Sequence, residues 1–310
     1  MKTPAANSGI KQPAPDGFIV VAVLWILGLL ATLVSIYVIF VINAASAFSV
    51  RDDRFRGEGL VSAALELTAY QLATPPELRP TRGQFNFRMG QANVAVEFRS
   101  EAARIDLNVA SKEVLAGLLA SLGASSENAD DYASRIIGWR TAPARGDDSE
   151  ASRYKAARLK YGPRGARFPH VDELSLVLDL PKPLVERALP FVTVYSGRAE
   201  VNVLDAAPEV IAALPGMTRE RLNAVLAQRQ ATGDRQSLLA LLGPAQKYAT
   251  LEGSKASRVT VHTDFDDGLR MSSEVVILVF EEGPDPYSIL SWHDGWDDLH
   301  TDGAPRISLR

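Results

Sequence analysis

The sequence predicts an α+β fold, in which a long N-terminal helix packs on a small antiparallel sheet and a large all-α domain is inserted between the strands. An uncharged apolar segment at residues 18–42, followed by helical spacing at 51–73, predicts the long helix. Alternating apolar and polar residues at 85–98 and 258–292 indicate the strands. The residues between these two groups have a mostly helical pattern, which favours an insertion over two domains in tandem.

The apolar segment Phe18–Ile42 is interpreted as a membrane-spanning helix. Its length of about 25 residues corresponds to roughly 37 Å of helix, more than the ~30 Å hydrocarbon core of a bilayer. Ala45-Ser46-Ala47 resembles a signal-peptide cleavage site, but the apolar region of a signal peptide spans only about 7 to 15 residues. A soluble core helix is disfavoured because it rarely lacks charge on every face. Lys2 and Lys11 favour a cytoplasmic N-terminus, with the rest of the chain across the membrane.

The elements that follow the membrane segment are predicted from spacing and turn residues. The helix continues with Leu60, Ala64 and Leu67 at helical spacing, and it ends at Thr74-Pro75-Pro76 because proline cannot continue the hydrogen-bond ladder. Strands at 85–89 and 94–98 form a hairpin with its turn at Gly90, and further strands are predicted at 258–261, 274–280 and 287–292.

Composition excludes several functional classes. The net charge is −4, so no basic surface favours a nucleic-acid partner. The chain has no cysteine, which excludes disulfides, thiol catalysis, iron–sulfur clusters and thiolate zinc sites. No combination of residues indicates a catalytic site, so the sequence predicts a protein that is not an enzyme.

The predicted insertion contains an internal repeat. Residues 105–115 align without gaps on residues 201–211, an offset of 96 residues. Each copy is a short strand that leads through a capping residue into a helix, with Glu113 or Glu209 in the first turn. Capping chemistry alone can produce so short a similarity, so duplication and coincidence both stay open.

The N-terminus carries a possible processing site. Residues 1–17 form a short leader with Lys2 and Lys11, and its last residue, Gly17, lies directly before Phe18. A glycine followed by an aromatic residue and a long apolar helix is the pattern that prepilin peptidases cut, so this region resembles a type IV pilin or pseudopilin. The resemblance implies cleavage after Gly17 and a methylated Phe18 as the new N-terminus. A glycine at the start of a helix often marks only the end of the preceding loop. The alternative that the leader is kept and the helix is an unprocessed membrane anchor therefore stays open.

The membrane segment departs from that superfamily at one position. Most members carry a glutamate at the fifth mature residue, where it meets the N-terminal amine of the neighbouring subunit, but the fifth residue after Gly17 is Ala22. A carboxylate in apolar surroundings is costly unless it is paired. A subunit without a neighbour above it has no amine to pair, so the loss of the glutamate suits the tip of a filament.

A series of short segments then gives a more specific resemblance by their order and spacing. They are residues 103–111 (ARIDLNVAS), 137–140 (IGWR), 168–174 (FPHVDEL), 190–196 (PFVTVYS), 201–203 (VNV), 213–216 (ALPG) and 289–292 (ILSW). Together with the helix that lacks the glutamate, they resemble the K-type minor pseudopilins of the type II secretion system, the general secretion pathway protein K family.

The resemblance implies a domain plan and a function. A pilin-like α/β core would comprise residues 76–110 and 245–310, with the leader at 1–17, the spine helix at 18–75 and the inserted helical domain at 111–244. The implied function is structural: a subunit at the tip of the periplasmic pseudopilus that initiates or caps fibre assembly during export of folded proteins across the outer membrane. The implied partners are the I-type and J-type minor pseudopilins, with the H-type as a further candidate, and the prepilin peptidase. The implied location is the bacterial inner membrane, crossed once, with the C-terminal domain periplasmic.

Other interpretations of individual motifs are weaker. Leu214-Pro215-Gly216 and the residues after it resemble a helix-hairpin-helix DNA-binding element, but the required second glycine is replaced by Thr218, which favours a pair of packing helices. Residues 264–268 resemble the start of a calcium loop, yet the twelfth loop position is Val275 instead of glutamate, which favours a hairpin turn. His293 and His300 lie among aspartates, a pattern more typical of a solvated acidic tail than of a metal site.

Calcium is the only cofactor candidate, and the resemblance places it in the helical insertion. Relatives are expected to bind calcium through an acidic loop after the Trp-Arg pair and an acidic residue four positions before a tyrosine. Glu150 precedes Tyr154 by four, and Asp147 and Asp148 lie close by. The loop at 141–145 lacks the expected acidic residues, and calcium requires about six oxygens. A calcium site and an ordinary solvated loop therefore both stay open.

The sequence thus predicts a structural assembly subunit anchored by one helix. The alternative is an unprocessed bitopic membrane protein whose periplasmic domain binds another partner.

Overall fold

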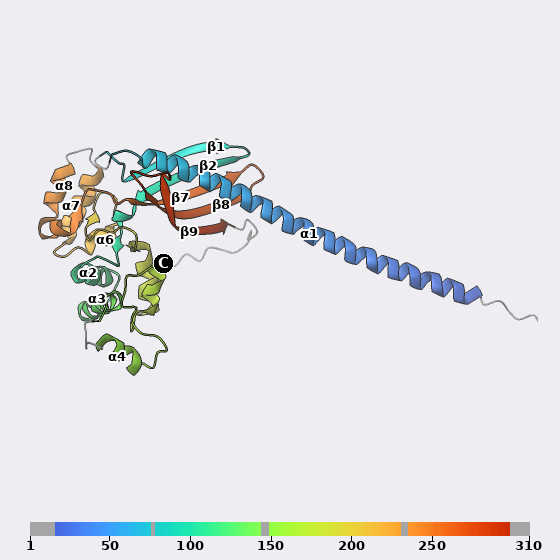
Figure 1. Cartoon of the computed structure of the whole chain (residues 1–310), viewed down its shortest axis with the longest axis horizontal. Coiled ribbons are helices and arrows are strands. Elements are labelled where there is room, and N and C mark those ends of the chain that lie inside the picture. The colour runs from blue at the N-terminus through green and yellow to red at the C-terminus, as the bar shows by residue number, and fades with distance from the viewer. Residues whose placement is uncertain (1–15, 76–77, 144–148, 231–234, 298–310) are drawn as a thin grey trace, which may run out of the picture. The chain divides into compact units, whose positions relative to one another are not determined.

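The computed structural model describes residues 16–75, 78–143, 149–230 and 235–297, and Figure 1 shows its helices and strands. The chain divides into two compact units, Met1–Glu58 and Gly59–Arg310, and each is described by itself. The predicted leader, apart from Asp16 and Gly17, lies outside the described residues.

The first unit consists of the long helix α1 (Asp16–Leu72), whose last residues belong to the second unit. It begins two residues before the predicted start at Phe18 and ends before the Thr74-Pro75 breaker. Within it, Val20–Val41 is long and apolar enough to cross a membrane, with a mean hydropathy of 2.5 and no residue buried inside the protein. Its 22 residues correspond to about 33 Å of helix. This fits the predicted single-pass anchor.

The second unit contains one five-stranded sheet. Its strands are β1 (Arg82–Met89), β2 (Ala92–Ser100), β7 (Ala256–Phe265), β8 (Arg270–Val279) and β9 (Tyr287–Asp297). They lie in the order β1-β2-β7-β8-β9, and every neighbouring pair is antiparallel. The predicted hairpin and the three later strands are therefore confirmed. Gly90 in the β1–β2 turn has a φ of +59°, a conformation that favours glycine.

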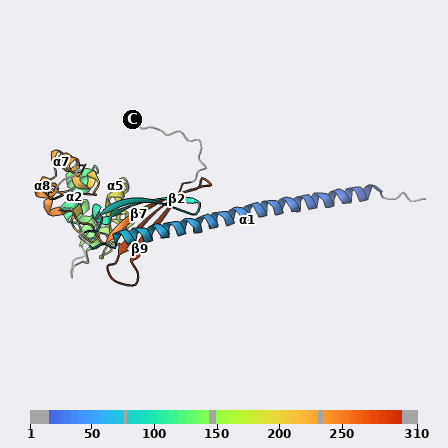
Figure 2. The same ribbon diagram turned by 90° about the horizontal axis from the view of Figure 1, so that it is seen from above.

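One face of the sheet packs on the end of α1, as Figure 2 shows from above. Strand alternation directs the apolar side chains of β2, β7 and β8 to this face, where they meet the helix at i, i+4 spacing. The core formed there comprises Leu60, Val61, Ala64, Leu65, Leu72, Ala92, Val94, Val96, Phe98, Val259, Val261, Val275, Ile277 and Val279. The opposite face carries the polar residues.

The segment between β2 and β7 is mostly helical and has a core of its own. Two short parallel strand pairs also lie in it, so the predicted all-α character of the insertion is not confirmed, and the segment belongs to the same compact unit as the sheet. Its helices are α2 (Lys112–Ser121), α3 (Ser126–Arg140), α4 (Ser149–Ala156), α5 (Lys182–Ala188), α6 (Pro208–Ala212), α7 (Arg219–Gln230) and α8 (Arg235–Leu241), with 3-10 turns η1 (Glu101–Ala103), η2 (Val171–Leu176), η3 (Leu189–Phe191) and η4 (Gly243–Tyr248).

The two copies of the sequence repeat have the same local structure. β3 (Ile105–Asp106) pairs in parallel with β4 (Val192–Thr193), and β5 (Val201–Asn202) pairs in parallel with β6 (Ala249–Thr250). The equivalent residues Asp106 and Asn202 each accept a backbone hydrogen bond from two residues on, both at 2.8 Å. If the helix caps were similar only by chance, the two copies would not also share a parallel partner strand. The structure therefore supports duplication.

Arginines and threonines extend the correspondence beyond the aligned residues. Arg140 donates to the carbonyl of Ala110 at 2.7 Å, and Arg229 donates to the equivalent carbonyl of Ala206 at 2.9 Å. Thr193 and Thr250, at the ends of β4 and β6, each accept a backbone hydrogen bond at 3.1 Å from the residue two positions later. Each copy is therefore a complete unit of strand, helices and returning strand.

The two copies meet at Gly117 of α2 and Ala213, which follows α6. These positions are equivalent in the repeat, and a Cβ at Gly117 would lie 2.0 Å from the Ala213 carbonyl oxygen. Contact between equivalent positions is what a local two-fold relation between two copies produces. Only glycine permits so close an approach of the two backbones.

We predict that Gly117→Ala lowers the free energy of unfolding by about 1–3 kcal/mol, because the new methyl group has no space against the Ala213 carbonyl. Gly59→Ala is the matched control, since a Cβ at this helical glycine would meet nothing within 4 Å, and it should raise the stability by about 0.5–1 kcal/mol. Chemical denaturation of the purified full chain measures both. Equal effects of the two substitutions would contradict the close contact.

Candidate functional site

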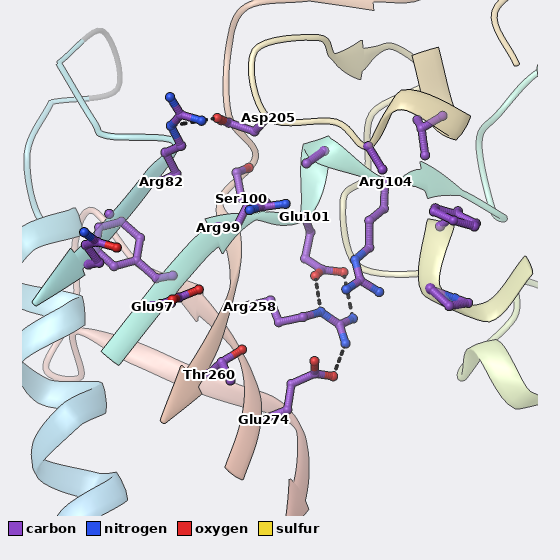
Figure 3. A pocket seen from close by; sticks show the side chains of 18 residues that line it. Arg82, Glu97, Arg99, Ser100, Glu101, Arg104, Asp205, Arg258, Thr260 and Glu274 are labelled. Atoms are coloured by element: carbon purple, nitrogen blue, oxygen red, sulfur yellow. Dashed lines mark hydrogen bonds and ion pairs between the residues drawn. The ribbon is translucent and has the colours of Figure 1, made fainter. Parts of the chain in front are cut away.

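The polar face of the sheet and the helical segment enclose a charged cleft of about 640 Å³, shown in Figure 3. We call it the junction cleft. It lies within the second unit and joins side chains that are more than 150 residues apart in the chain, such as Glu101 and Arg258. Its charged lining residues are Arg82, Glu97, Arg99, Glu101, Arg104, Asp205, Arg258 and Glu274.

Strand register explains why these charges gather on one face. Arg82, Arg99 and Arg258 lie directly opposite one another on β1, β2 and β7. Opposed residues of neighbouring antiparallel strands point to the same side, so the three arginines form a row across the sheet. The residues beside them on β2 and β7, Phe98 and Val259, point to the core on the other face.

Glu101 connects the sheet to the helical segment. Its side chain is 1% exposed and accepts from two nitrogens of Arg258, at 2.8 Å from Nε and 3.3 Å from Nη2. Thr193 of β4 donates to the same carboxylate, and Arg258 also donates to Glu274 on β8. Two-point arginine–carboxylate pairs fix both position and orientation. Strands β7 and β8 are thereby tied to the start of the helical segment.

This arrangement shifts the pKa values of Arg258 and Arg104. Burial alone would lower the pKa of Arg258, but the hydrogen bonds and charges of Glu101 and Glu274 outweigh burial and raise that pKa. Arg104, half-buried beside them, has a lowered pKa because of burial and the nearby positive charge of Arg258. Both guanidinium groups remain charged at neutral pH. The cleft therefore holds permanent positive charges next to a buried carboxylate.

Asp205 lies on the helical side of the cleft. Its side chain is 1% exposed, and Oδ1 lies 3.4 Å from Nε of Arg82. The other oxygen, Oδ2, is buried without a hydrogen-bond partner among the described residues. Burial lowers the pKa of Arg229, while the negative charge of Asp205 acts in the opposite direction. A second sheet-to-helix contact thus lies at this end of the cleft.

The predicted calcium ligands are only partly placed. Asp147 and Asp148 lie outside the described residues. Glu150, 20% exposed, has Oε2 at 3.2 Å from Arg153, while Oε1 is buried and has no partner in the described part of the chain. No group of three or more His, Asp or Glu side chains among the described residues could hold a metal ion.

The other sequence candidates are placed as follows. Gly17 and Phe18 lie in the first turns of α1, and the side chain of Phe18 is outside the described residues. Residues 264–268 include the turn between β7 and β8, as predicted. Gly216 has a φ of +79° and lies between the packed helices α6 and α7, in agreement with a packing pair. His300 lies outside the described residues, and His293 instead contacts His170, with ring centroids 5.7 Å apart.

Sequence reasoning missed the junction cleft. The available signal was the alternation of charged residues with core residues on β2, where Glu97 and Arg99 flank Phe98. Alternation indicates a polar face, but it does not identify what covers that face. Glu101 and Asp205 gave no signal, because their partners come from distant segments.

Comparison with known proteins agrees with this architecture. Residues 90–197 match the family model described as "Type II secretion system (T2SS), protein K". A chain of the crystal structure of the GspK-GspI-GspJ complex from the enterotoxigenic Escherichia coli type 2 secretion system is similar, with a TM-score of 0.60 and 17% sequence identity. The similarity covers 79% of this chain and 98% of that chain. Comparison with curated proteins gives no match.

The chain is therefore a mixed α+β protein with a long N-terminal apolar helix, an antiparallel sheet and a helical segment, and its fold is similar to that of a chain of the GspK-GspI-GspJ complex. The residues that match the type II secretion system protein K model contain β2, Glu101, Arg104 and Thr193. The resemblance to the K-type minor pseudopilins, predicted from the short sequence segments, is confirmed.

We predict that Glu101→Gln or Arg258→Met lowers the free energy of unfolding by about 3–5 kcal/mol, because each leaves a buried charge without its partner. The double variant should lose less than the sum, since it leaves neither charge unpaired. Arg88→Gln is the control, as its pair with Asp266 is about half exposed and should contribute under about 1 kcal/mol.

Denaturation of the full chain measures all four variants. A fully additive double variant, or single losses no larger than that of Arg88→Gln, would show that the pair does not hold the junction.

Proposed function

We propose that this protein is a structural, non-enzymatic minor pseudopilin that occupies the tip of the type II secretion pseudopilus and initiates or caps fibre assembly. The observation that carries the proposal is the protein K domain at residues 90–197, on a chain whose apolar helix continues into the sheet core. The family match supports a role in type II secretion, and we propose the position at the tip in addition.

The apolar helix supports the tip position. Among the described side chains of Val20–Val41 there is no carboxylate, and Ala22 is where most pilin-like subunits carry glutamate. In a filament, an unpaired carboxylate at this depth would be costly, whereas an apolar residue is not. A subunit without a neighbour above it needs no such group.

The proposed partners are the I-type and J-type minor pseudopilins. Their inclusion rests on the similarity to a chain of the GspK-GspI-GspJ complex, together with the proposed tip position. The inner membrane would hold the helix until assembly, with the second unit in the periplasm, and the H-type subunit is a further candidate for contact.

Removal of the leader by a prepilin peptidase is part of this proposal. Cleavage after Gly17 would leave Phe18 as a methylated N-terminus at the start of the apolar helix. The alternative is that the leader stays attached and the protein is a bitopic membrane protein that binds another periplasmic partner.

We predict that the full chain, produced with a prepilin peptidase and the I-type and J-type subunits of its own secretion system, begins at Phe18 and is isolated from detergent extracts with both subunits. Gly17→Ala should retain Met1, lose the two subunits and abolish secretion, because an uncleaved leader keeps the helix in the membrane. N-terminal sequencing, mass spectrometry and a secretion assay measure these outcomes.

Gly28→Ala is the matched control, since this glycine lies in the same apolar helix and a Cβ there meets nothing within 4 Å. It should be cleaved and assembled normally. Secretion by a protein that still begins at Met1 would support the unprocessed alternative.

We also propose a calcium ion bound by Glu150 with Asp147 and Asp148. The supporting observation is the buried Oε1 of Glu150, which has no partner among the described residues. Arg153 lies against the other oxygen, and the described residues supply no group of three or more possible metal-binding side chains. The remaining oxygens of a site with about six would come from residues 147–148, backbone carbonyls and water.

We predict that calcium at about 5 mM raises the melting temperature of the full chain relative to a chelator, because a ligand that binds only the folded state stabilises it. Glu150→Gln should abolish the rise, and the exposed Glu186→Gln should not. No rise in the wild-type protein would contradict the proposed calcium site.

A further inference from the structure

The row of arginines across the sheet is not fully neutralised. Like charges directly opposite one another on neighbouring strands are destabilising unless they are compensated. Arg258 is compensated by Glu101 and Glu274, and Arg82 by Asp205. Arg99 lies between Arg82 and Arg258 on β2, and no carboxylate of the described residues lies within ion-pair distance of its guanidinium.

Arg104 adds a further positive charge to the same cleft. It comes from the chain between η1 and β3, is half-buried and lines the cleft together with Arg99 (Figure 3). Burial is the main cause of its lowered pKa; the positive charges of Arg258 and Arg99 also lower that pKa, whereas the negative charges of Glu101 and Glu274 act in the opposite direction. No carboxylate of the described part of the chain lies within ion-pair distance of Arg104.

The acidic groups of the cleft are mostly engaged elsewhere. Glu101 and Glu274 bind Arg258, and Asp205 faces Arg82 and lies near Arg229. Glu97 is exposed on the same face of β2, two residues from Arg99, a spacing of about 6.6 Å along the strand. It weakens the positive potential without reaching ion-pair contact.

We propose that the junction cleft binds a carboxylate group, held between Arg99 and Arg104. A guanidinium fork matches the two oxygens of a carboxylate, and both Arg99 and Arg104 line the same cleft. Arg104 is partly buried in the cleft, so solvent screens its charge less than it would on an open surface. At about 640 Å³ the cleft admits a side chain or a small molecule as well as a lone ion.

This proposal does not depend on the pseudopilin function, because it rests on the charges of the cleft alone. The carboxylate could come from an acidic side chain of another protein or from a free small molecule. The two sources share the same recognition chemistry, so the experiment includes a probe for each.

The test is isothermal titration of the purified full chain in detergent at low salt, with succinate as one probe and an acetylated triglutamate peptide as the other. We expect saturable binding that Arg99→Gln and Arg104→Gln each weaken by about tenfold, as loss of a charge-assisted hydrogen-bonded pair would. Raising the ionic strength should also weaken binding. Arg88→Gln, on β1 outside the cleft, should bind like the wild type.

The pattern across the two probes identifies the source. Binding of both probes, lost in both variants, assigns the cleft to free carboxylates as well as side chains, and binding of the peptide alone assigns it to an acidic side chain of a protein partner. Absence of binding by both probes, or unchanged binding by a folded Arg99→Gln variant, would overturn the proposal. Arg99 is exposed, so this variant tests binding even if Arg104→Gln fails to fold.

Discussion

The ion pair between Arg258 and Glu101 is the interaction on which the placement of the helical segment depends. Glu101 lies where the chain leaves β2, and Arg258 lies near the start of β7, where the chain has returned to the sheet. Removing both charges from water is costly, and only the paired geometry, with Thr193 and Glu274 as further partners, offsets that cost. An alternative position of the helical segment would remove the hydrogen bond from Thr193 to the buried Glu101 carboxylate. The pair therefore specifies one arrangement of sheet and segment more than it adds stability.

The two faces of the sheet have separate roles because strand side chains alternate. The apolar face packs on the end of α1, so the helix that carries the apolar stretch Val20–Val41 is continuous with the core of the second unit. The polar face is left to the helical segment and to the charged cleft between them.

The helical segment contains two copies with similar local structure, which supports an origin by duplication. Two units of strand, helices and returning strand meet where Gly117 approaches the backbone of Ala213. The copies have diverged in their polar groups: Asp106 accepts from the backbone of Gly197, whereas Asn202 donates to the carbonyls of Leu251 and Glu252. Burial raises the pKa of Asp106, a cost that the amide of Asn202 does not carry. The two copies therefore have the same backbone arrangement, but their polar side chains form different hydrogen bonds.

The sequence by itself determined the long helix, the five predicted strands, the apolar span and the resemblance to the type II secretion system protein K family, because these depend on local periodicity, on turn residues and on short segments in a fixed order. It also showed the repeat, although capping chemistry could have explained it. Only the tertiary structure decided that the short strands of the two copies pair in parallel with β4 and β6, and that Glu101, Asp205 and the arginines form one cleft. Those facts depend on contacts between residues such as Glu101 and Arg258, 157 positions apart, and nothing in the local sequence of either residue indicates its partner.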